Sequence, residues 1–145
     1  MDAPDLSIRP EALRVVKHAT PTPVEFAAGD GVCRTLEGPV SYHAGDAILT
    51  GVKGERWPVV RAHFDASYAP TGREGLYAKR PAVAFALRLQ APMEVIVGWR
   101  PDALNAKPGD WLLSYADGEH GVVRDDIFRE TYGPAPGETR WPPPL

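Results

Sequence analysis

One sequence pattern occurs twice in this chain, and the repeat constrains the fold more than any other feature. Shifting the sequence by 64 positions aligns residues 42–70 with residues 106–134 without a gap. Nine of the 29 aligned positions are identical, whereas average composition would give roughly two by chance. The identical pairs are Gly45/Gly109, Asp46/Asp110, Leu49/Leu113, Gly54/Gly118, Glu55/Glu119, Val59/Val123, Phe64/Phe128, Tyr68/Tyr132 and Pro70/Pro134. A repeat of this length predicts two units with the same local fold.

The repeated residues are typical of turns and short strands. Glycine in Ala-Gly-Asp and in Pro-Gly-Asp can adopt positive φ, and Asp46 and Asp110 can then accept hydrogen bonds from turn amides. Asp117-Gly118 is typical of a tight hairpin. Each Gly-Asp turn is followed by an apolar run of strand length, at residues 46–52 and 110–116. A second run follows the next glycine turn in each unit, at residues 56–62 and 120–126.

The two units also share a predicted helical turn and two leading strands. Phe64 and Tyr68 are four residues apart, as are Phe128 and Tyr132, so a short helix can place both rings of a pair on one face. Lys17-His18 and Lys79-Arg80 each precede a strand-like stretch. The leading strands are predicted at residues 21–28 and 32–42 in the first unit and at 82–90 and 93–99 in the second.

The sequence therefore predicts a mainly β protein with two tandem units, each of about four strands and a short helix. The expected organisation is a tail at 1–14, repeat unit one at 15–70, a linker at 71–76, repeat unit two at 77–134 and a loosely held, proline-rich tail at 135–145. A unit of roughly 55 residues buries little apolar surface alone. We therefore expect the two units to pack face to face around a shared core as one compact, pseudo-symmetric body.

Composition limits the function classes. The 145 residues carry a formal net charge of -3, so nothing draws the chain strongly to nucleic acid or acidic lipid. No apolar run approaches the roughly 20 residues that a membrane helix needs. Cys33 is the only cysteine, which excludes an internal disulfide, and the first residues do not resemble a secretory signal. We expect a cytoplasmic protein with no membrane or nucleic-acid partner.

Several motifs resemble a known family. The first unit carries Thr-Leu-Glu-Gly at 35–38, Gly-Asp at 45–46, Gly-Val-Lys-Gly-Glu at 51–55 and a closing Phe64…Tyr68. These resemble small proteins found in tailed phages and bacterial genomes. The second unit, with Tyr-Ala-Lys-Arg-Pro at 77–81 and Pro-Gly-Asp-Trp at 108–111, is similar to the Pro-Gly-Asp-Tyr-Gly (PGDYG) motif family. The resemblance supports the architecture and implies no particular activity.

The reactive residue types form no familiar catalytic or metal motif. Cys33 lies in an alternating, strand-like run without a histidine at a known family spacing, so we interpret it as a packed thiol. The four histidines are widely spaced and suggest no metal site. Asp46 and Asp110 could form a carboxylate pair for acid–base chemistry, but turn capping explains both equally well. We expect no cofactor.

The positions at which the two units differ are the better candidates for a binding site, because folding explains the shared residues. Tryptophan and arginine are enriched at binding hot spots, and Trp99 has no clear counterpart in the first unit. Arg61 and Arg124 each follow a strand and could hold an anion. The predicted site residues are Arg56, Trp57, Arg61, Trp111, Tyr115, His120 and Arg124. The alternative interpretation is that the aromatic rings fill an asymmetric core between the units.

Three functions remain open on the sequence alone. The leading hypothesis is a non-enzymatic binding or interaction module, with an unknown protein or a small anionic ligand as its partner and an origin in a mobile element. The second is a sensor that binds an anionic or nucleotide-like molecule between the units. The third is a hydrolase that uses Asp46 and Asp110 or His120. A concave pocket between the units with inward-pointing cations would favour the sensor.

Overall fold

The computed structural model describes residues 6–96, 103–115 and 119–142, and these form a mainly β protein with short helices. The helical elements are η1 (Leu6–Ile8), α1 (Arg61–Ser67) and α2 (Asp125–Thr131). The strands are β1 (Leu13–Lys17), β2 (Thr22–Phe26), β3 (Gly31–Thr35), β4 (Gly38–Tyr42), β5 (Ala47–Thr50), β6 (Arg56–Val59), β7 (Tyr68–Pro70), β8 (Leu76–Lys79), β9 (Val83–Arg88), β10 (Met93–Ile96), β11 (Ala103–Ala106), β12 (Trp111–Ser114), β13 (His120–Val123) and β14 (Tyr132–Pro134). None of the helices in the described ranges is long and apolar enough to span a membrane.

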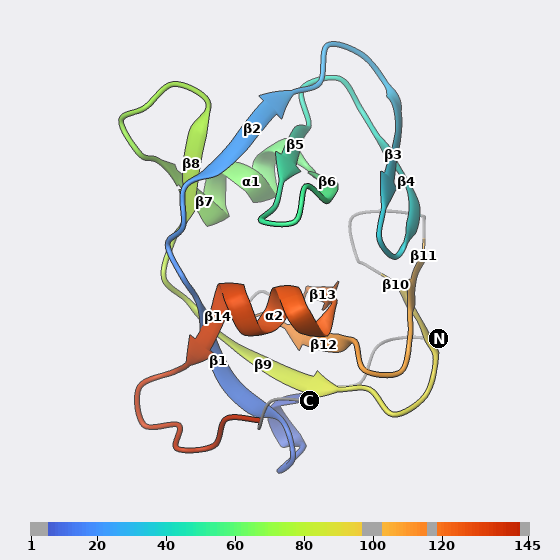
Figure 1. Ribbon diagram of the computed structural model, residues 1–145. Coiled ribbons are helices and arrows are strands. Elements are labelled where there is room, and N and C mark those ends of the chain that lie inside the picture. Colours follow the sequence, from blue (N-terminus) through green and yellow to red (C-terminus); the bar gives the residue numbers. More distant parts are fainter. Residues whose placement is uncertain (1–5, 97–102, 116–118, 143–145) are drawn as a thin grey trace.

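The strands form two five-stranded antiparallel sheets. Sheet I has the order β6-β5-β2-β8-β7, and sheet II has the order β13-β12-β9-β1-β14. Sheet I, α1 and the β3–β4 hairpin make up half I, which is the upper part of Figure 1. Sheet II, α2 and the β10–β11 hairpin make up half II below it, and α2 lies on the side of its sheet that faces half I.

The chain crosses between the two sheets twice. β1 lies in sheet II beside β9 and β14, but the next strand, β2, lies in sheet I. β8 lies in sheet I beside β2 and β7, and β9, which follows it, returns to sheet II. The two crossing segments run beside each other on the left of Figure 1. Sheet II therefore contains β1, which comes before the strands of half I in the sequence. Sheet I contains β8, which comes directly before the strands of half II.

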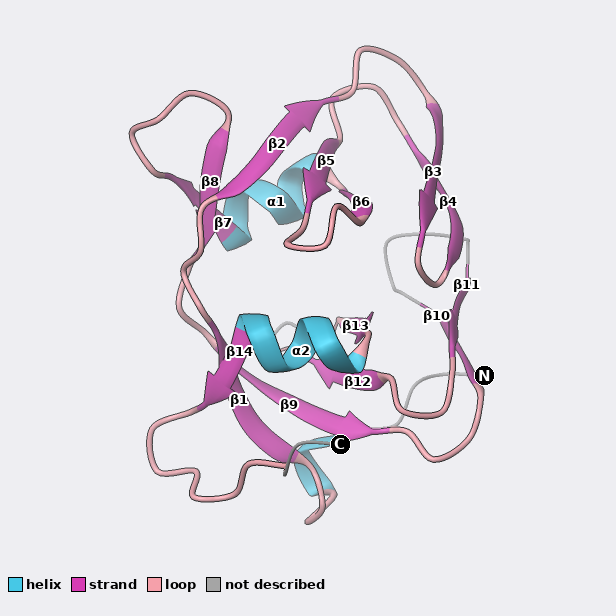
Figure 2. Cartoon of the chain, viewed as in Figure 1, coloured by secondary structure: helices cyan, strands magenta, loops and turns pink. Residues whose placement is uncertain are grey.

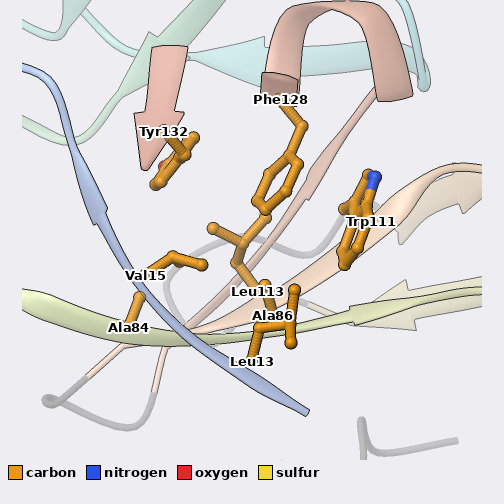
Figure 3. Close-up of a cluster of buried hydrophobic side chains, with 8 residues drawn as sticks. All are labelled: Leu13, Val15, Ala84, Ala86, Trp111, Leu113, Phe128 and Tyr132. Carbon is orange, nitrogen blue, oxygen red and sulfur yellow. The ribbon is translucent and has the colours of Figure 1, made fainter. Parts of the chain in front are cut away.

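Each half has its own hydrophobic core, which differs from the shared core predicted from the sequence. In half II, Leu13 and Val15 of β1 pack with Phe128, Trp111 and neighbouring residues of β9 and β12 (Figure 3). In half I, Phe64 and Tyr68 pack with strand residues of β2, β5 and β6. The crossing strands supply the apolar area that a small unit lacks, so face-to-face burial of one common core is not needed.

The two hairpins join the halves on the other side of the molecule. β3–β4 and β10–β11 lie one above the other on the right of Figure 2. The amide of Asn105 on β11 donates a 2.9 Å hydrogen bond to the carbonyl of Glu37, in the turn between β3 and β4. The sequence predicted residues 32–42 as one strand. The structure instead folds them back at residues 36–37, with Gly38 at φ 118°.

The predicted turn role of the Gly-Asp pairs is confirmed. Gly45 and Gly109 have φ of 87° and 93°, in the region that favours glycine. Asp46 accepts a 2.9 Å hydrogen bond from the His43 amide, and Asp110 accepts a 3.0 Å bond from the Lys107 amide. Both carboxylates are thus committed to the turns that precede β5 and β12. The predicted Asp117-Gly118 hairpin and Trp99 lie outside the described residues.

The predicted ring pairs are also confirmed. The rings of Phe64 and Tyr68 stack with centroids 5.0 Å apart, and those of Phe128 and Tyr132 with centroids 5.3 Å apart. In each half the tyrosine ends the helix and begins the next strand, β7 or β14.

The C-terminal segment is held against the body, so the prediction of a loose tail is wrong over residues 135–142. Arg140 donates hydrogen bonds to the carbonyls of Pro10 and Ala12, at 2.7 and 3.1 Å. Its guanidinium also bonds Glu138, and these bonds lower the pKa of the Glu138 carboxyl to about 2. Trp141 stacks on Phe128 with centroids 5.5 Å apart.

Candidate functional site

A pocket of about 290 Å³ lies between the two halves. Its wall in half I comes from β5, β6, the β3–β4 turn and α1, and its wall in half II comes from β13, α2 and the start of β14. The two crossing segments contribute Lys17, His18 and Lys79. This volume lies near the lower end for small-molecule sites in proteins, so the pocket suits a compact ligand.

Lys17 and Lys79 occupy corresponding places in the two sheets. Lys17 is the last residue of β1 and pairs with Tyr132, the first residue of β14. Lys79 is the last residue of β8 and pairs with Tyr68, the first residue of β7. The next amide of each crossing strand, from His18 or from Arg80, donates a 2.8 Å hydrogen bond to the carbonyl of the last helical residue. The same register therefore delivers a lysine to the pocket from each direction.

Aromatic rings surround the Lys17 ammonium. Its Nζ lies 5.3 Å from the ring centroid of Trp57 in half I and 5.9 Å from that of Tyr132 in half II. Both distances are typical of cation–π contacts, which offset only part of the cost of removing a charge from water. Among the described residues, no carboxylate lies within ion-pair distance of this ammonium.

The protonation of Lys17 reflects this environment. Burial lowers the pKa of the Lys17 ammonium from 10.5 to about 8, because the low-polarity surroundings disfavour the charged form. The charge of Glu55 opposes this effect only in part. The side chain retains some accessible surface because it faces the pocket. At pH 7 most molecules carry a cation there, and about a tenth carry the free amine.

Lys79 and three tyrosines complete the polar part of this region. The Lys79 Nζ lies 4.3 Å from the ring centroid of Tyr115 and 5.8 Å from that of Tyr68. The hydroxyls of Tyr115 and Tyr132 are 3.4 Å apart. Burial raises the pKa of both Tyr68 and Tyr132 above the ordinary range, so their phenols are neutral hydrogen-bond donors at physiological pH.

Glu37 adds a carboxyl group whose charge changes near neutrality. Burial at the pocket wall, together with the negative charges of Asp110 and Glu55, raises the pKa of Glu37 to about 7. Arg124 and Lys107 oppose the increase but do not cancel it. The net charge of the pocket wall therefore becomes more positive as the pH falls through 7.

Five of the seven predicted site residues line the pocket. Trp57, Tyr115 and His120 are half-buried there. The two pocket arginines are exposed and already paired: Arg56 lies 2.7 Å from Glu25, and Arg124 bonds Asp126 at 2.6 and 2.9 Å. These ion pairs leave Lys17 as a pocket cation that has no carboxylate within ion-pair distance among the described residues.

The other two predicted residues lie elsewhere. Trp111 is 3% exposed, stacks on Phe128 with centroids 4.1 Å apart and donates a 2.9 Å hydrogen bond to Asp125, so it belongs to the core of half II. Arg61 is exposed, lies 3.9 Å from the ring centroid of Phe26 and is paired with Asp65. Neither lines the pocket between the halves.

Sequence reasoning missed Lys17, Lys79, Tyr68 and Tyr132 as pocket residues. The signal was present, because Tyr68 and Tyr132 are an identical pair of the repeat and both lysines precede a strand. These residues were attributed to folding alone. The structure shows that one residue can do both: each tyrosine ring stacks on the phenylalanine of its helix, and each tyrosine also lines the pocket.

The carboxylate pair considered from the sequence does not meet in this pocket. Asp46 and Asp110 accept turn hydrogen bonds and do not line this pocket. Cys33 is buried on the β3–β4 hairpin. In the described ranges, no three His, Cys, Asp or Glu side chains are close enough to hold a metal ion. The arrangement as a whole can attract an anion and donate hydrogen bonds to it.

Comparison with known proteins gives one family. Residues 38–133 match the family described as PGDYG protein, and this match covers more than half of the chain. The search of curated proteins and the search of solved structures gave no match. The matched range extends from β4 to β14 and so includes most of both halves. The chain therefore belongs to the PGDYG protein family.

Proposed function

We propose that this protein binds a small anionic molecule in the pocket between its two halves, without chemistry at a carboxylate pair. The observation that carries the proposal is the Lys17 ammonium, which faces the pocket between Trp57 and Tyr132 with no carboxylate partner among the described residues. Glu55 lines the same pocket, but its charge only partly offsets the cost of enclosing this cation. A bound anion removes that cost and supplies the missing partner.

The chemistry of the wall supports this ligand class. Two lysines arrive from opposite directions, and the Tyr132 and Tyr115 hydroxyls are neutral donors or acceptors nearby. Trp57 offers a flat apolar face beside the Lys17 charge. Carboxylates and phosphate esters with a planar body combine the charge and the surface that this wall complements.

The other two functions have less support. A docking surface built on the predicted tryptophans has less support, because Trp111 is in the core and Trp57 lines the pocket. A hydrolase would need two carboxylates that share a cleft, but Asp46 and Asp110 are bonded to separate turns. Anion binding is also the function that places the ligand in the pocket between the halves.

A thermal-shift panel tests the proposal. The intact protein is heated with inorganic phosphate, oxalate, citrate or AMP, each at matched ionic strength. We expect at least one anion to raise the unfolding midpoint of the wild type and to have little effect on Lys17→Met. Lys107→Met, at an exposed lysine, is the matched control and keeps the wild-type response. If no anion shifts the wild type, or if Lys17→Met responds as the wild type does, the proposal is wrong.

We further infer that the chain arose by duplication of one unit whose copies exchange their first strands. The support is the identical order of elements in sheets I and II, together with the matching lysine–tyrosine registers. The proposed units remain residues 15–70 and 77–134, flanked by tails and joined at 71–76. β1 and β8 begin one or two residues earlier, at Leu13 and Leu76. The result is a compact, pseudo-symmetric body with a pocket at its seam.

A further inference from the structure

Lys17 is more enclosed than a lysine that only forms an ion pair needs to be. A surface lysine would hold an anion without any loss of solvation and would remain fully protonated. Lys17 instead lies between two aromatic rings in a pocket, where burial lowers its pKa to about 8. Desolvation of this kind is a known way to make a lysine nucleophilic at neutral pH.

From this geometry we propose that Lys17 forms a covalent imine with the bound ligand, so that the pocket takes a small anion that carries an aldehyde or ketone group. This inference rests on the proposed anion-binding function and specifies its ligand class. The anionic group is held by the remaining donors of the pocket. The carbonyl carbon then approaches the Nζ of Lys17, a residue that lines the same pocket.

The chemical step balances without an oxidant or reductant. Lys17 first loses its extra proton to solvent. The nitrogen lone pair attacks the carbonyl carbon, a C–N bond forms, and the C=O double bond becomes a hydroxyl. The two hydrogens of the neutral amine leave with the carbonyl oxygen as water, which gives the C=N bond. Tyr132 pairs with Lys17 across the strands and carries a neutral hydroxyl that can donate to the oxygen as it leaves.

The four lysines of the chain make the inference testable at single residues. They are Lys17, Lys53, Lys79 and Lys107, of which Lys53 and Lys107 are exposed. Intact protein at pH 7 is treated with glyoxylate, the smallest anionic aldehyde, and with cyanoborohydride, which reduces any imine to a stable amine. Peptide mapping over time then gives a labelling rate for each lysine. Acetaldehyde serves as the neutral aldehyde of similar size.

We expect glyoxylate to label Lys17 at least about tenfold faster than Lys53 and Lys107, since a pKa near 8 leaves far more free amine at pH 7 than a pKa of 10.5. Acetaldehyde should show a smaller preference for Lys17. Lys17→Arg keeps the charge but has no amine, so it should lose the fast labelling. Equal labelling of Lys17 and the exposed lysines would overturn the inference.

Oxalate separates this inference from the function on which it rests. If saturating oxalate slows the labelling of Lys17, both are supported. If Lys17 is labelled fast but oxalate has no effect, the nucleophilic lysine stands and anion binding fails. If oxalate stabilises the wild type but not Lys17→Met, while Lys17 is labelled no faster than Lys107, anion binding stands and imine formation fails.

Discussion

The Nζ of Lys17 on β1 lies 5.3 Å from the ring centroid of Trp57 on β6, although these strands belong to different sheets. The contact exists because the chain crosses from sheet II to sheet I directly after Lys17. A residue at the crossing point is reached by side chains from both halves. The exchange of strands thus places the Lys17 cation in the pocket between the halves. Its effect on the free energy of unfolding can be measured.

Removal of the Lys17 charge should stabilise the protein. Between pH 8 and 10.5 the unfolded chain holds a proton on Lys17 that the folded protein has lost, so stability rises with pH across this window. At pH 7 the ammonium is therefore a net cost, and we expect Lys17→Met to raise the free energy of unfolding by about 1–3 kcal/mol. The gain should shrink as the pH rises towards 10.5.

Urea denaturation at several pH values measures this effect. Lys107→Met is the control, because an exposed lysine should change stability by less than about 0.5 kcal/mol. A Lys17→Met protein that is less stable than the wild type at pH 7 would mean that the cation–π contacts outweigh desolvation. Stability gained by removing a residue is typical of functional sites.

Truncation of Trp111 should mainly reduce stability, whereas truncation of Trp57 should mainly weaken anion binding. Trp111→Ala removes a buried ring from the stack on Phe128, and we expect a loss of about 3–5 kcal/mol in unfolding free energy. Trp57→Ala removes a half-buried ring at the pocket wall, so the stability loss should be smaller and anion binding should weaken. Chemical denaturation and calorimetric titration of both variants compare the two roles. Equal losses of stability would contradict this assignment.

Glu37 should make stability fall as the pH rises through neutrality. Its folded pKa of about 7 exceeds the value of 4.5 expected when unfolded, so the folded state binds the proton more tightly. Its favourable contribution is fully present below pH 4.5 and is lost as the pH rises through 7. Glu37→Gln should therefore stabilise the protein by about 1–2 kcal/mol at pH 8 and have little effect at pH 4. Glu94→Gln, at an exposed strand position, is the control for denaturation at both pH values.

The two turn glycines should be equally intolerant of alanine. Gly45→Ala and Gly109→Ala each force a side chain into positive φ, which costs about 1–2 kcal/mol. Gly29 has open space around its Cα and no positive φ, so Gly29→Ala is the matched control and should be close to neutral. Thermal unfolding of the three variants provides the comparison. A neutral effect at Gly45 with a large effect at Gly109 would show that the two turns are not equivalent.

Local features of the fold were predictable from the sequence, but the strand exchange was not. The Gly-Asp turns and the Phe–Tyr ring pairs follow from interactions within a few residues, and the structure contains both. Which sheet receives β1 or β8 depends on pairing between distant segments, and periodicity carries no information about it. The expectation of one shared core failed for this reason.

The candidate site was predictable only in part. Trp57 and Tyr115 stood out because they differ between the units, and they do line the pocket. Trp111 was selected by the same criterion, but its indole is buried under α2. Lys17 looked ordinary because its significance comes from its surroundings: only the crossing of the chain places its ammonium between rings from two halves.

Proton uptake on anion binding tests the central claim most directly. An anion bound beside Lys17 restores the pKa of the ammonium, so at pH 8, where about half of the molecules carry free amine, binding should take up as much as about half a proton. Calorimetric titration with the anion that gives the largest thermal shift, in buffers of different ionisation enthalpy, measures this uptake. We predict a clear uptake at pH 8 that nearly vanishes at pH 6 and is much smaller in Lys17→Arg, where Glu37 can still take up a proton. Binding without uptake in the wild type, or with the same uptake in Lys17→Arg, would contradict the account.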